Sequence, residues 1–411
     1  MGIQADGCTT NGGTRVGSPA FRLSLAPFWD RIAFDFSLPG GKLTAPVNAH
    51  PFNPHVATLP VYVPGRPIEE VARELGLDPT GVIKLASNEN PLGPSPRALA
   101  AMDRTLKSLH LYPDGSAFHL KRALAHRLGV DASNVILGNG SNEIIEFLGH
   151  AFLRPGDEVV VSEYCFAVYP IVTALFGARL VTVPAQRFGA DIPGMLQAIT
   201  PATRMLFLAN PNNPTGTLAA REEIAALLAG VPRHVVLVLD EAYVEFLEDP
   251  ADGLALIREG THPNVIVMRT FSKIFGLAGL RLGYGVAQPE LIAGLERIRQ
   301  PFNINSLAQA GALAALEDAD HLAATRSNNQ QGLDLLHGAF SKMGLEYIPS
   351  HANFVMVRVG DGARVFAELQ RRGVITRPTA GYALPEWLRI TVGLPAENHR
   401  CLEALREILG R

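Results

Sequence analysis

The stretch Val235-Val236-Leu237-Val238-Leu239-Asp240-Glu241 decides which fold the chain can adopt. Five apolar residues that end at a carboxylate are typical of a strand buried on both faces, and such strands belong to parallel sheets that helices cover. Open sheets of this kind bind ligands beyond the carboxyl ends of their strands. We therefore expect Asp240, Glu241 and Tyr243 to face a ligand, although an aspartate after a strand is more often a turn residue or a helix cap.

Short apolar runs on either side of this strand alternate with segments of helical pattern. Segments such as 143–153 and 221–228 place apolar residues three and four positions apart, as amphipathic helices require. The expected strands are 135–137, 159–161, 180–183, 205–208, 235–239 and 265–268, with 283–286 as a further, antiparallel strand. This alternation predicts an α/β fold in which a doubly wound, mostly parallel sheet forms a large domain.

The pattern changes after about residue 300. A helical stretch at 307–316 is followed by mixed elements, with strands expected at 346–348, 354–357, 374–376 and 388–392 and helices at 363–371 and 397–409. This mixture is typical of a smaller α+β domain, which a helix at 68–75 would join from the amino-terminal side.

The chain of 411 residues is long enough for two domains. We expect a poorly ordered leader at residues 1–57, an arm with part of the small domain at 58–110, the large domain at 111–300 and the rest of the small domain at 301–411.

Composition excludes several classes of protein. Apolar residues make up 47% and charged residues 18% of the chain, and the net charge of −3 gives no basic surface for nucleic acid. No apolar run approaches the roughly 20 residues that cross a bilayer, so we expect no membrane protein. Cys8, Cys165 and Cys401 are far apart and odd in number, which favours free thiols in the cytoplasm over a disulfide framework or a metal site.

Chemistry is indicated first by Lys273. It ends the run Val267-Met268-Arg269-Thr270-Phe271-Ser272-Lys273 and precedes a loop that contains Gly276, Gly279 and Arg281. Burial at such a place lowers the pKa of a lysine toward a reactive free amine, which can form a Schiff base. A lysine after a strand is more often a solvated loop charge. However, a lysine, an aspartate and an arginine together are the protein groups that pyridoxal phosphate needs for its aldehyde, ring nitrogen and phosphate.

Two turns add possible ligand contacts. Gly138-Asn139-Gly140-Ser141-Asn142 follows an expected strand and opens a helix, so its backbone amides could bind an anion at Ser141 and Asn142. Asn210-Pro211-Asn212-Asn213-Pro214-Thr215-Gly216 follows another strand, and Asn213 is biased away from helical geometry because it precedes a proline. The alternative is a glycine turn with an ordinary helix cap for the first segment and a plain tight turn for the second.

The chain resembles the fold-type I pyridoxal-phosphate aminotransferases, most closely the histidinol-phosphate aminotransferases, from about Leu59 to its end. The matching motifs are Leu59-Pro60-Val61-Tyr62-Val63-Pro64-Gly65, Leu85-Ala86-Ser87-Asn88-Glu89-Asn90-Pro91-Leu92-Gly93, Tyr112-Pro113-Asp114-Gly115, Asn213-Pro214-Thr215-Gly216, Asp240-Glu241-Ala242-Tyr243, Ser272-Lys273 and Leu388-Arg389-Ile390-Thr391-Val392-Gly393. The motifs agree in order and spacing as well as in sequence.

The resemblance implies pyridoxal 5′-phosphate as the cofactor. It implies that Lys273 forms the Schiff base and then moves the proton, and that Asp240 keeps the ring nitrogen protonated. Further contacts to the ring and the phosphate are implied at Asn213, Tyr243, Phe166, Ser141, Asn142, Ser272 and Arg281, with Tyr112 reaching in from the second subunit of a homodimer that shares its active sites.

For the substrate, the resemblance implies that Arg389 clamps a carboxylate, with Arg377, Tyr62 and Asn88 nearby. Tyr62, like Tyr112, is expected to act across the subunit interface. The alternative for Arg389 is a surface arginine of the small domain. The implied reaction is transfer of the amino group of L-histidinol phosphate to 2-oxoglutarate. Because Tyr382 lies beside the arginines in the sequence pattern, an aromatic amino acid aminotransferase is the second hypothesis. A threonine-phosphate decarboxylase and a non-catalytic cofactor-binding module are the remaining ones.

Overall fold

The computed structural model describes Val56, Leu59, Val61, Tyr62 and residues 64–411. Apart from Val56, the leader expected at 1–57 lies outside the described residues, and so does Cys8 within it. Pro60 and Val63 of the first motif also lie outside them. Cys165 and Cys401 are free thiols, as expected. Within the described part, no helix is long and apolar enough to cross a membrane.

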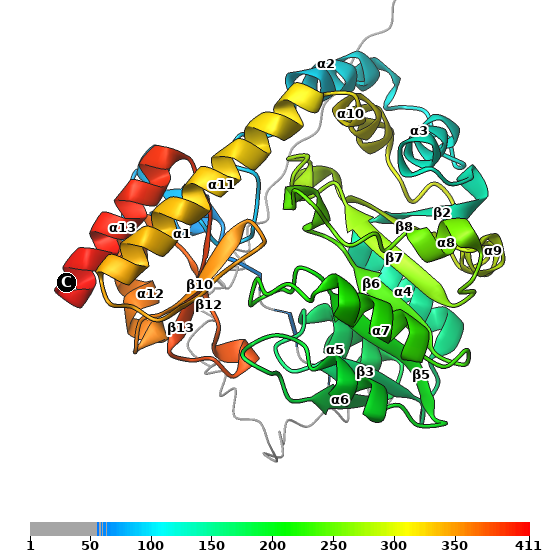
Figure 1. Ribbon diagram of the computed structural model, residues 1–411. Helices are drawn as coiled ribbons and strands as arrows, with labels where there is room; N and C mark the ends of the chain where they lie inside the picture. Colours follow the sequence, from blue (N-terminus) through cyan, green and yellow to red (C-terminus); the bar gives the residue numbers. More distant parts are fainter. Residues whose placement is uncertain (1–55, 57–58, 60, 63) are drawn as a thin grey trace, which may run out of the picture. The chain divides into compact units, whose positions relative to one another are not determined.

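A seven-stranded sheet is the centre of the large domain (Figure 1). Its strand order is β2-β8-β7-β6-β5-β3-β4, in which β8 runs antiparallel to both neighbours and the other pairs are parallel. The strands are β2 (Val135–Asn139), β3 (Glu158–Ser162), β4 (Arg179–Val183), β5 (Thr203–Ala209), β6 (Val236–Asp240), β7 (Val265–Thr270) and β8 (Leu282–Ala287). The prediction of a doubly wound sheet is confirmed, including the antiparallel β8.

Helices cover both faces of this sheet because successive strand residues point to opposite sides. In β6, for example, Leu237 packs with one core and Val238 with the other. One face is covered by α4 (Ser141–Phe152), α5 (Val168–Leu175) and α9 (Pro289–Glu296). The other is covered by α3 (Phe118–Leu128), α6 (Ile192–Gln197), α7 (Arg221–Gly230) and α8 (Ala255–Glu259).

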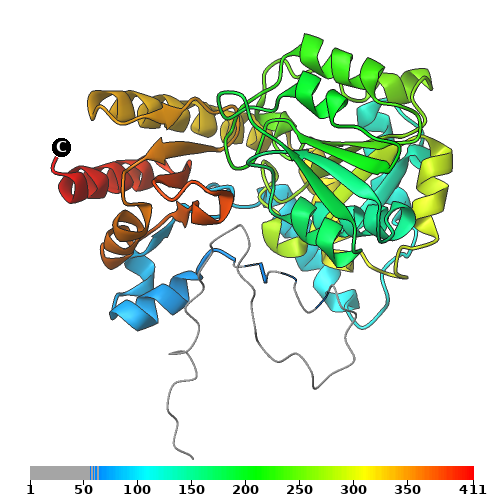
Figure 2. The ribbon, with the colours of Figure 1, turned by 90° about the horizontal axis from the view of Figure 1, so that it is seen from below.

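The small domain contains a four-stranded antiparallel sheet in the order β12-β13-β10-β9. Its strands are β9 (Tyr347–Ile348), β10 (Phe354–Arg358), β12 (Arg377–Pro378) and β13 (Trp387–Thr391), and its helices are α12 (Gly362–Arg371) and α13 (Pro395–Leu409). A two-stranded parallel ladder joins β1 (Ile83–Lys84) to β11 (Val374–Ile375), and α1 (Ile68–Leu75) packs against Ile375. Figure 2 shows these elements grouped beside the large sheet.

The longest helix was not predicted. Helix α11 (Ala319–Lys342) places Leu322 in the core of the large sheet and Leu333 in the core of the small domain, so it links the two. The polar run in its middle hides the helical period, but those side chains serve tertiary contacts: Asn328 and Asn329 donate to the carbonyls of Gly393 and Ala352. At Gly332 a Cβ would collide with Val392, so only glycine permits this close approach.

The packing of α2 and α10 affects where the boundary between the two domains is drawn. Helices α2 (Pro96–Thr105) and α10 (Ser306–Leu316) pack on each other, and Ala98 and Ala308 belong to the core of the large sheet. The boundaries at residues 57, 110 and 300 stay a proposal. We propose that α2 and α10 be counted with the large domain, so that the boundary at 110 moves to before α2 and the boundary at 300 moves into α11.

Candidate active site

A cavity of about 240 Å³ opens beyond the carboxyl ends of β5, β6 and β7, where the sequence predicts a ligand. Its floor includes Ala209, Asp240 and Thr270, which are the last residues of these three strands. The opposite wall comes from β12, β13 and the segment near Asn88. Two residues that were expected to face a ligand do not line this cavity: Tyr112 is exposed, and Glu241 is buried in an ion pair with Arg269. The other residues predicted for the site all line it: Tyr62, Asn88, Ser141, Asn142, Phe166, Asn213, Asp240, Tyr243, Ser272, Lys273, Arg281, Arg377 and Arg389.

Lys273 lies in the wall of the cavity just after β7. Its Nζ donates a 3.1 Å hydrogen bond to the carbonyl oxygen of Ser87 and lies 5.7 Å from the centroid of the Tyr243 ring. Burial lowers the pKa of the Lys273 ammonium group to about 8, and the positive charges of Arg389 and Arg281 act in the same direction. About a tenth of the side chain is therefore a free amine at pH 7, far more than for an ordinary lysine, and this form is the one that nucleophilic and proton-transfer chemistry requires.

Asp240 is buried at the end of β6 and accepts two hydrogen bonds. The hydroxyl of Tyr169 donates to Oδ2 at 2.6 Å, and the backbone N–H of Ala242 donates to Oδ1 at 3.2 Å. Burial raises the pKa of Asp240, whereas these two hydrogen bonds and the charge of Lys273 lower it. The carboxylate is thus held in one orientation and has a cation nearby.

Asn88 links the small-domain wall to Tyr243. Its Nδ2 donates to the Tyr243 hydroxyl at 2.9 Å, and its Oδ1 accepts from the Thr391 hydroxyl at 3.1 Å. The backbone of Asn88 is left-handed, with φ of 57°, a conformation that asparagine tolerates better than most residues. The amide and the phenol are therefore both fixed before any ligand binds.

Two arginines occupy the small-domain wall. Arg377 in β12 is directly opposite Arg389 in β13, and both line the cavity. Arg389 Nη1 donates to Asn213 Oδ1 at 2.5 Å and Nη2 donates to the carbonyl of Ala86 at 2.9 Å. Its Nε is buried and finds no acceptor among the described residues. Since a buried guanidinium with an unpaired donor is costly, this wall is suited to an anionic ligand.

The amino-terminal end of α4 supplies a second place for an anion. Gly140 precedes the helix with φ of 75° and offers no side-chain cap to the first-turn N–H groups. A Cβ at Gly140 would collide with the Arg281 guanidinium, and one at Gly283 would collide with the backbone of Ser141. These two glycines therefore allow the amino-terminal end of α4 and the Arg281 side chain to come close together. We call Ser141, Asn142, Ser272 and Arg281, which all line the cavity, the anion cradle.

The known proteins most informative about this arrangement are aminotransferases. The model of the family described as aminotransferase class I and II matches residues 80–405. This chain belongs to the class I and II aminotransferases. It is 51% identical to a histidinol-phosphate aminotransferase of Akkermansia muciniphila, over 87% of this chain and 98% of that protein. It is 54% identical to histidinol-phosphate aminotransferase 2 of Pseudomonas fluorescens, over 87% and 97% of the two chains.

A solved structure has the same fold as this aminotransferase. It is a histidinol-phosphate aminotransferase from Sinorhizobium meliloti in complex with pyridoxal-5'-phosphate. The TM-score is 0.80 at 30% sequence identity, and the match covers 88% of this chain and 98% of that one. The predicted resemblance to fold-type I aminotransferases is confirmed.

Sequence reasoning missed some residues that line the cavity of the aminotransferase or support it from behind, as Tyr169 does. Tyr169 was not predicted because its contact with Asp240 joins positions 71 residues apart and depends on how α5 packs on the sheet. Ser87 enters through its carbonyl, which any residue type offers. Tyr382 lines the cavity and was noted only as a neighbour of the arginines. Tyr112 lies outside the cavity of its own chain and is 82% exposed, so its role across subunits stays a prediction.

Proposed function

We propose that this aminotransferase uses pyridoxal 5′-phosphate to move the amino group of L-histidinol phosphate to 2-oxoglutarate. The products are imidazole acetol phosphate and L-glutamate, and the step belongs to histidine biosynthesis. The names of the two relatives at 51% and 54% identity support this reaction. The structural observation that carries it is the meeting of Lys273, Asp240, the anion cradle and the arginine pair in one cavity.

The donor set of the cavity fits pyridoxal phosphate. The uncapped helix end and Arg281 suit its phosphate, the buried Asp240 suits its ring nitrogen, and the Lys273 amine suits its aldehyde. Phe166, Asn213 and Tyr243 are the proposed contacts to the ring and its phenolic oxygen. When bound, the cofactor supplies a conjugated ring that takes up the electron pair left when a proton leaves the substrate carbon.

The residues of the chain position the groups and move the proton. As a free amine, Lys273 Nζ accepts the proton from the substrate carbon; as an ammonium group, it then donates that proton to another atom. A pKa of about 8 makes both steps accessible near neutral pH. Burial raises the pKa of Asp240, and its hydrogen bonds from Tyr169 and Ala242 oppose that rise. The same bonds hold the carboxylate where it would face the ring nitrogen of the cofactor and favour its protonated form. Asn88 keeps the Tyr243 hydroxyl in place.

Arg377 and Arg389 are the proposed substrate clamp. Both half-reactions bring an anion to the same wall, a phosphate with the amino donor and a carboxylate with the acceptor. A planar guanidinium can bind either with two parallel hydrogen bonds. Tyr62, which was expected to act across the interface, lies in the cavity of its own chain, with its ring centroid 5.9 Å from the Arg377 Cζ. Asn88 also lines this cavity.

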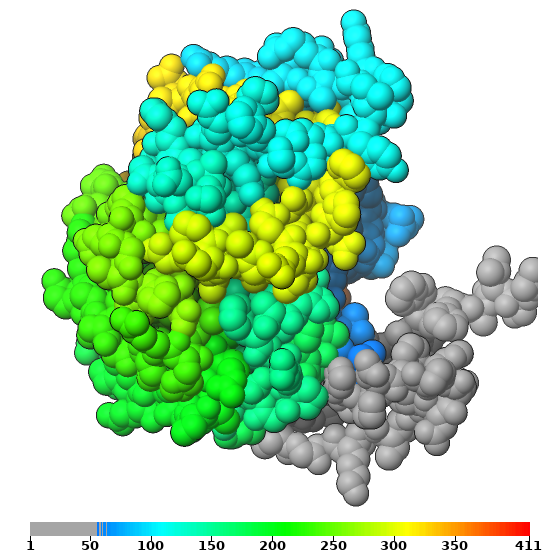
Figure 3. Space-filling model, turned by 90° about the vertical axis from the view of Figure 1, so that its right-hand side faces the viewer, coloured from blue at the N-terminus to red at the C-terminus, as the bar shows by residue number. Residues whose placement is uncertain are grey.

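We further propose a cytoplasmic homodimer with shared active sites. Large apolar side chains are exposed around α2, α3 and the segment between them: Leu99, Leu106, Leu109, Leu111, Tyr112 and Phe118, together with Phe302. Figure 3 shows the segments that include α3 and α9 as neighbours on one face of the protein. An apolar cluster of this kind is what a second copy of the chain would cover.

One experiment tests the reaction and its nearest alternative. Cofactor-loaded protein is mixed with L-histidinol phosphate or with L-phenylalanine, without a 2-oxo acid, and the absorbance band of the bound cofactor is followed through a single turnover. We expect the band to disappear much faster with L-histidinol phosphate. Faster loss with L-phenylalanine would indicate an aromatic aminotransferase, which Tyr382 in the cavity wall favours as second candidate. No loss with either compound would contradict both.

A further inference from the structure

Two exposed aromatic side chains stack on the proposed dimer face. The rings of Tyr112 and Phe302 lie 4.7 Å apart between centroids, with 23° between their planes, although the two residues are 82% and 46% exposed. Phe302 has a left-handed backbone with φ of 59°. This conformation is rare for a bulky residue and persists only where surrounding contacts impose it.

Those contacts hold Phe302 from both sides. The next residue, Asn303, donates through Nδ2 to Glu143 Oε2 at 2.7 Å and accepts at Oδ1 from Arg299 Nη1 at 2.9 Å. On the other side Phe302 lies over Gly115, where a Cβ would come within 3.3 Å of the ring. A larger residue at position 115 would therefore press on the ring and make it shift by a few tenths of an ångström.

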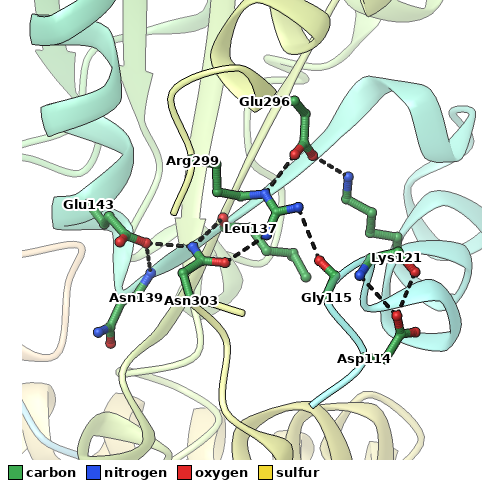
Figure 4. A network of polar contacts seen from close by, with 10 residues as sticks. Asp114, Gly115, Lys121, Leu137, Asn139, Glu143, Glu296, Arg299 and Asn303 are labelled. Atoms are coloured by element: carbon green, nitrogen blue, oxygen red, sulfur yellow. Dashed lines mark hydrogen bonds and ion pairs between the residues drawn. The ribbon is translucent and has the colours of Figure 1, made fainter. Parts of the chain in front are cut away.

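Arg299 joins the two segments that carry the stacked rings. Its Nη2 donates to the carbonyl of Gly115 at 3.0 Å, while its Nη1 holds Asn303 (Figure 4). Glu296 Oε2 accepts from Arg299 Nε, and Glu296 Oε1 accepts from Lys121, both at 2.6 Å. The loop with Tyr112 and the loop with Phe302 are thus fixed to each other by one guanidinium.

The same network reaches the anion cradle. Glu143 is in the first turn of α4, directly after Ser141 and Asn142, and its Oε2 accepts from the backbone N–H of Asn139 at 2.6 Å. We call Glu143, Asn303 and Arg299 the brace. It connects the cradle of one chain to Tyr112 of that same chain, and Tyr112 does not line that chain's own cavity.

We propose that Phe302 is a positioning residue for the active site of the other subunit. It holds Tyr112 of its own chain in the orientation that serves the cofactor phosphate across the interface, and the brace ties that orientation to the cradle of its own subunit. The inference rests on the proposed function and on the proposed homodimer. This role would explain why an exposed aromatic pair is held by a left-handed backbone and by the brace.

The first test measures cofactor affinity. Phe302→Ala should weaken binding of pyridoxal phosphate about tenfold, as Tyr112→Phe should by removing the hydroxyl, since a hydrogen bond to a charged group contributes on the scale of a tenfold change in binding. Adding Phe302→Ala to Tyr112→Phe should weaken binding no further, because Phe302 acts only through Tyr112. Phe302→Tyr keeps the ring and should bind like the wild type. Additive losses, or no loss in Phe302→Ala, would overturn the proposal.

A matched control is Phe118→Ala. Phe118 is 50% exposed near the same surface, and its ring lies against His119 and Arg122 instead of Tyr112. The substitution should leave cofactor affinity unchanged. Sedimentation of all variants reports whether they remain dimers. If Phe118→Ala and Phe302→Ala weaken cofactor binding equally, the stack is only part of the apolar surface and the inference fails.

Hybrid dimers show in which subunit Phe302 acts. When Lys273→Ala and Phe302→Ala are on different chains, the only site with Lys273 receives an unchanged Tyr112 and Phe302 from the other chain, and it should have wild-type KM and kcat. When both substitutions are on one chain, that site should show the Phe302→Ala defect. The reverse pattern would place the effect within one chain. Failure of the wild type to react with any amino donor would instead contradict the proposed function.

Discussion

The hydroxyl of Tyr169 donates a 2.6 Å hydrogen bond to Oδ2 of Asp240, and both side chains are buried. The Tyr169 ring also stacks on Phe207 at 4.4 Å and meets Phe166 edge-on at 5.6 Å. One residue of α5 therefore orients both the carboxylate and the ring that are proposed to contact the pyridine of the cofactor. Neither contact requires the hydroxyl of Tyr169 to touch a ligand.

Tyr169→Phe removes the hydrogen bond to Asp240 and keeps the ring that packs against Phe166, so it tests the hydrogen bond alone. Burial raises the pKa of Asp240 and the Tyr169 hydrogen bond lowers it, so Tyr169→Phe should raise this pKa further. Less carboxylate is then ionised at a given pH, and the acid limb of the kcat profile should move to higher pH. We expect kcat to fall about tenfold or more with little change in KM. An unmoved acid limb with unchanged kcat would contradict this role.

The amine of Lys273 should titrate far below an ordinary lysine. In protein without cofactor, labelling by an amine-reactive sulfonate should follow the neutral amine, rising with pH to a midpoint near 8, as read from the Lys273 peptide by mass spectrometry. Arg389→Met should move the midpoint upward, because burial is the largest cause of the lowered pKa and the Arg389 charge the next. A midpoint near 10.5 in the wild type would contradict the site geometry.

The same residue is expected to be indispensable for transfer. Lys273→Ala should lower the single-turnover rate by at least about a thousandfold, because it removes the group that moves the proton. Retained turnover would contradict the proposed mechanism, whereas normal binding of the cofactor without turnover would agree with it.

Local sequence signals predicted the strands and the polar residues at their carboxyl ends. Lys273 and Asp240 lie just after or at the end of apolar runs, and the parallel sheet brings those ends together. The helix α11 was missed because its middle is polar, and its apolar period emerges only when Leu322 and Leu333 are assigned to two different cores. Contacts such as Asn88 to Tyr243, 155 residues apart, depend on how the small domain packs and have no local signal.

Substitutions at Arg389 test whether the planar shape of the guanidinium matters or only its positive charge. Its Nη1 and Nη2 hold Asn213 and Ala86 at the same time, and a lysine has no planar fork to do so. Arg389→Lys should therefore lower kcat/KM for 2-oxoglutarate about a hundredfold, nearly as much as Arg389→Ala. The control is Arg358→Ala in the neighbouring β10, since Arg358 is on the surface and pairs with Glu346 and Glu386. Equal effects of the two positions would exclude a specific clamp.

The anion cradle can be tested with two glycines of similar backbone. Gly140 has φ of 75° and Gly129, at the end of α3, has φ of 66°, so alanine at either position should cost about 1 kcal/mol or more in unfolding free energy. They differ in what a Cβ would touch. At Gly140 it would collide with the Arg281 guanidinium, whereas at Gly129 it would make an ordinary 3.6 Å contact with Arg258.

Only Gly140→Ala should therefore weaken the binding of pyridoxal phosphate, and of inorganic phosphate as a competitor for the same place. Equilibrium dialysis of both ligands, beside chemical denaturation of both variants, separates strain from loss of the cradle. Because Arg281 must move away from the α4 amino terminus to admit the new methyl group, the loss for inorganic phosphate should parallel the loss for the cofactor. If Gly129→Ala weakened both ligands as much, the effect would come from general destabilisation and the cradle would not be the phosphate site.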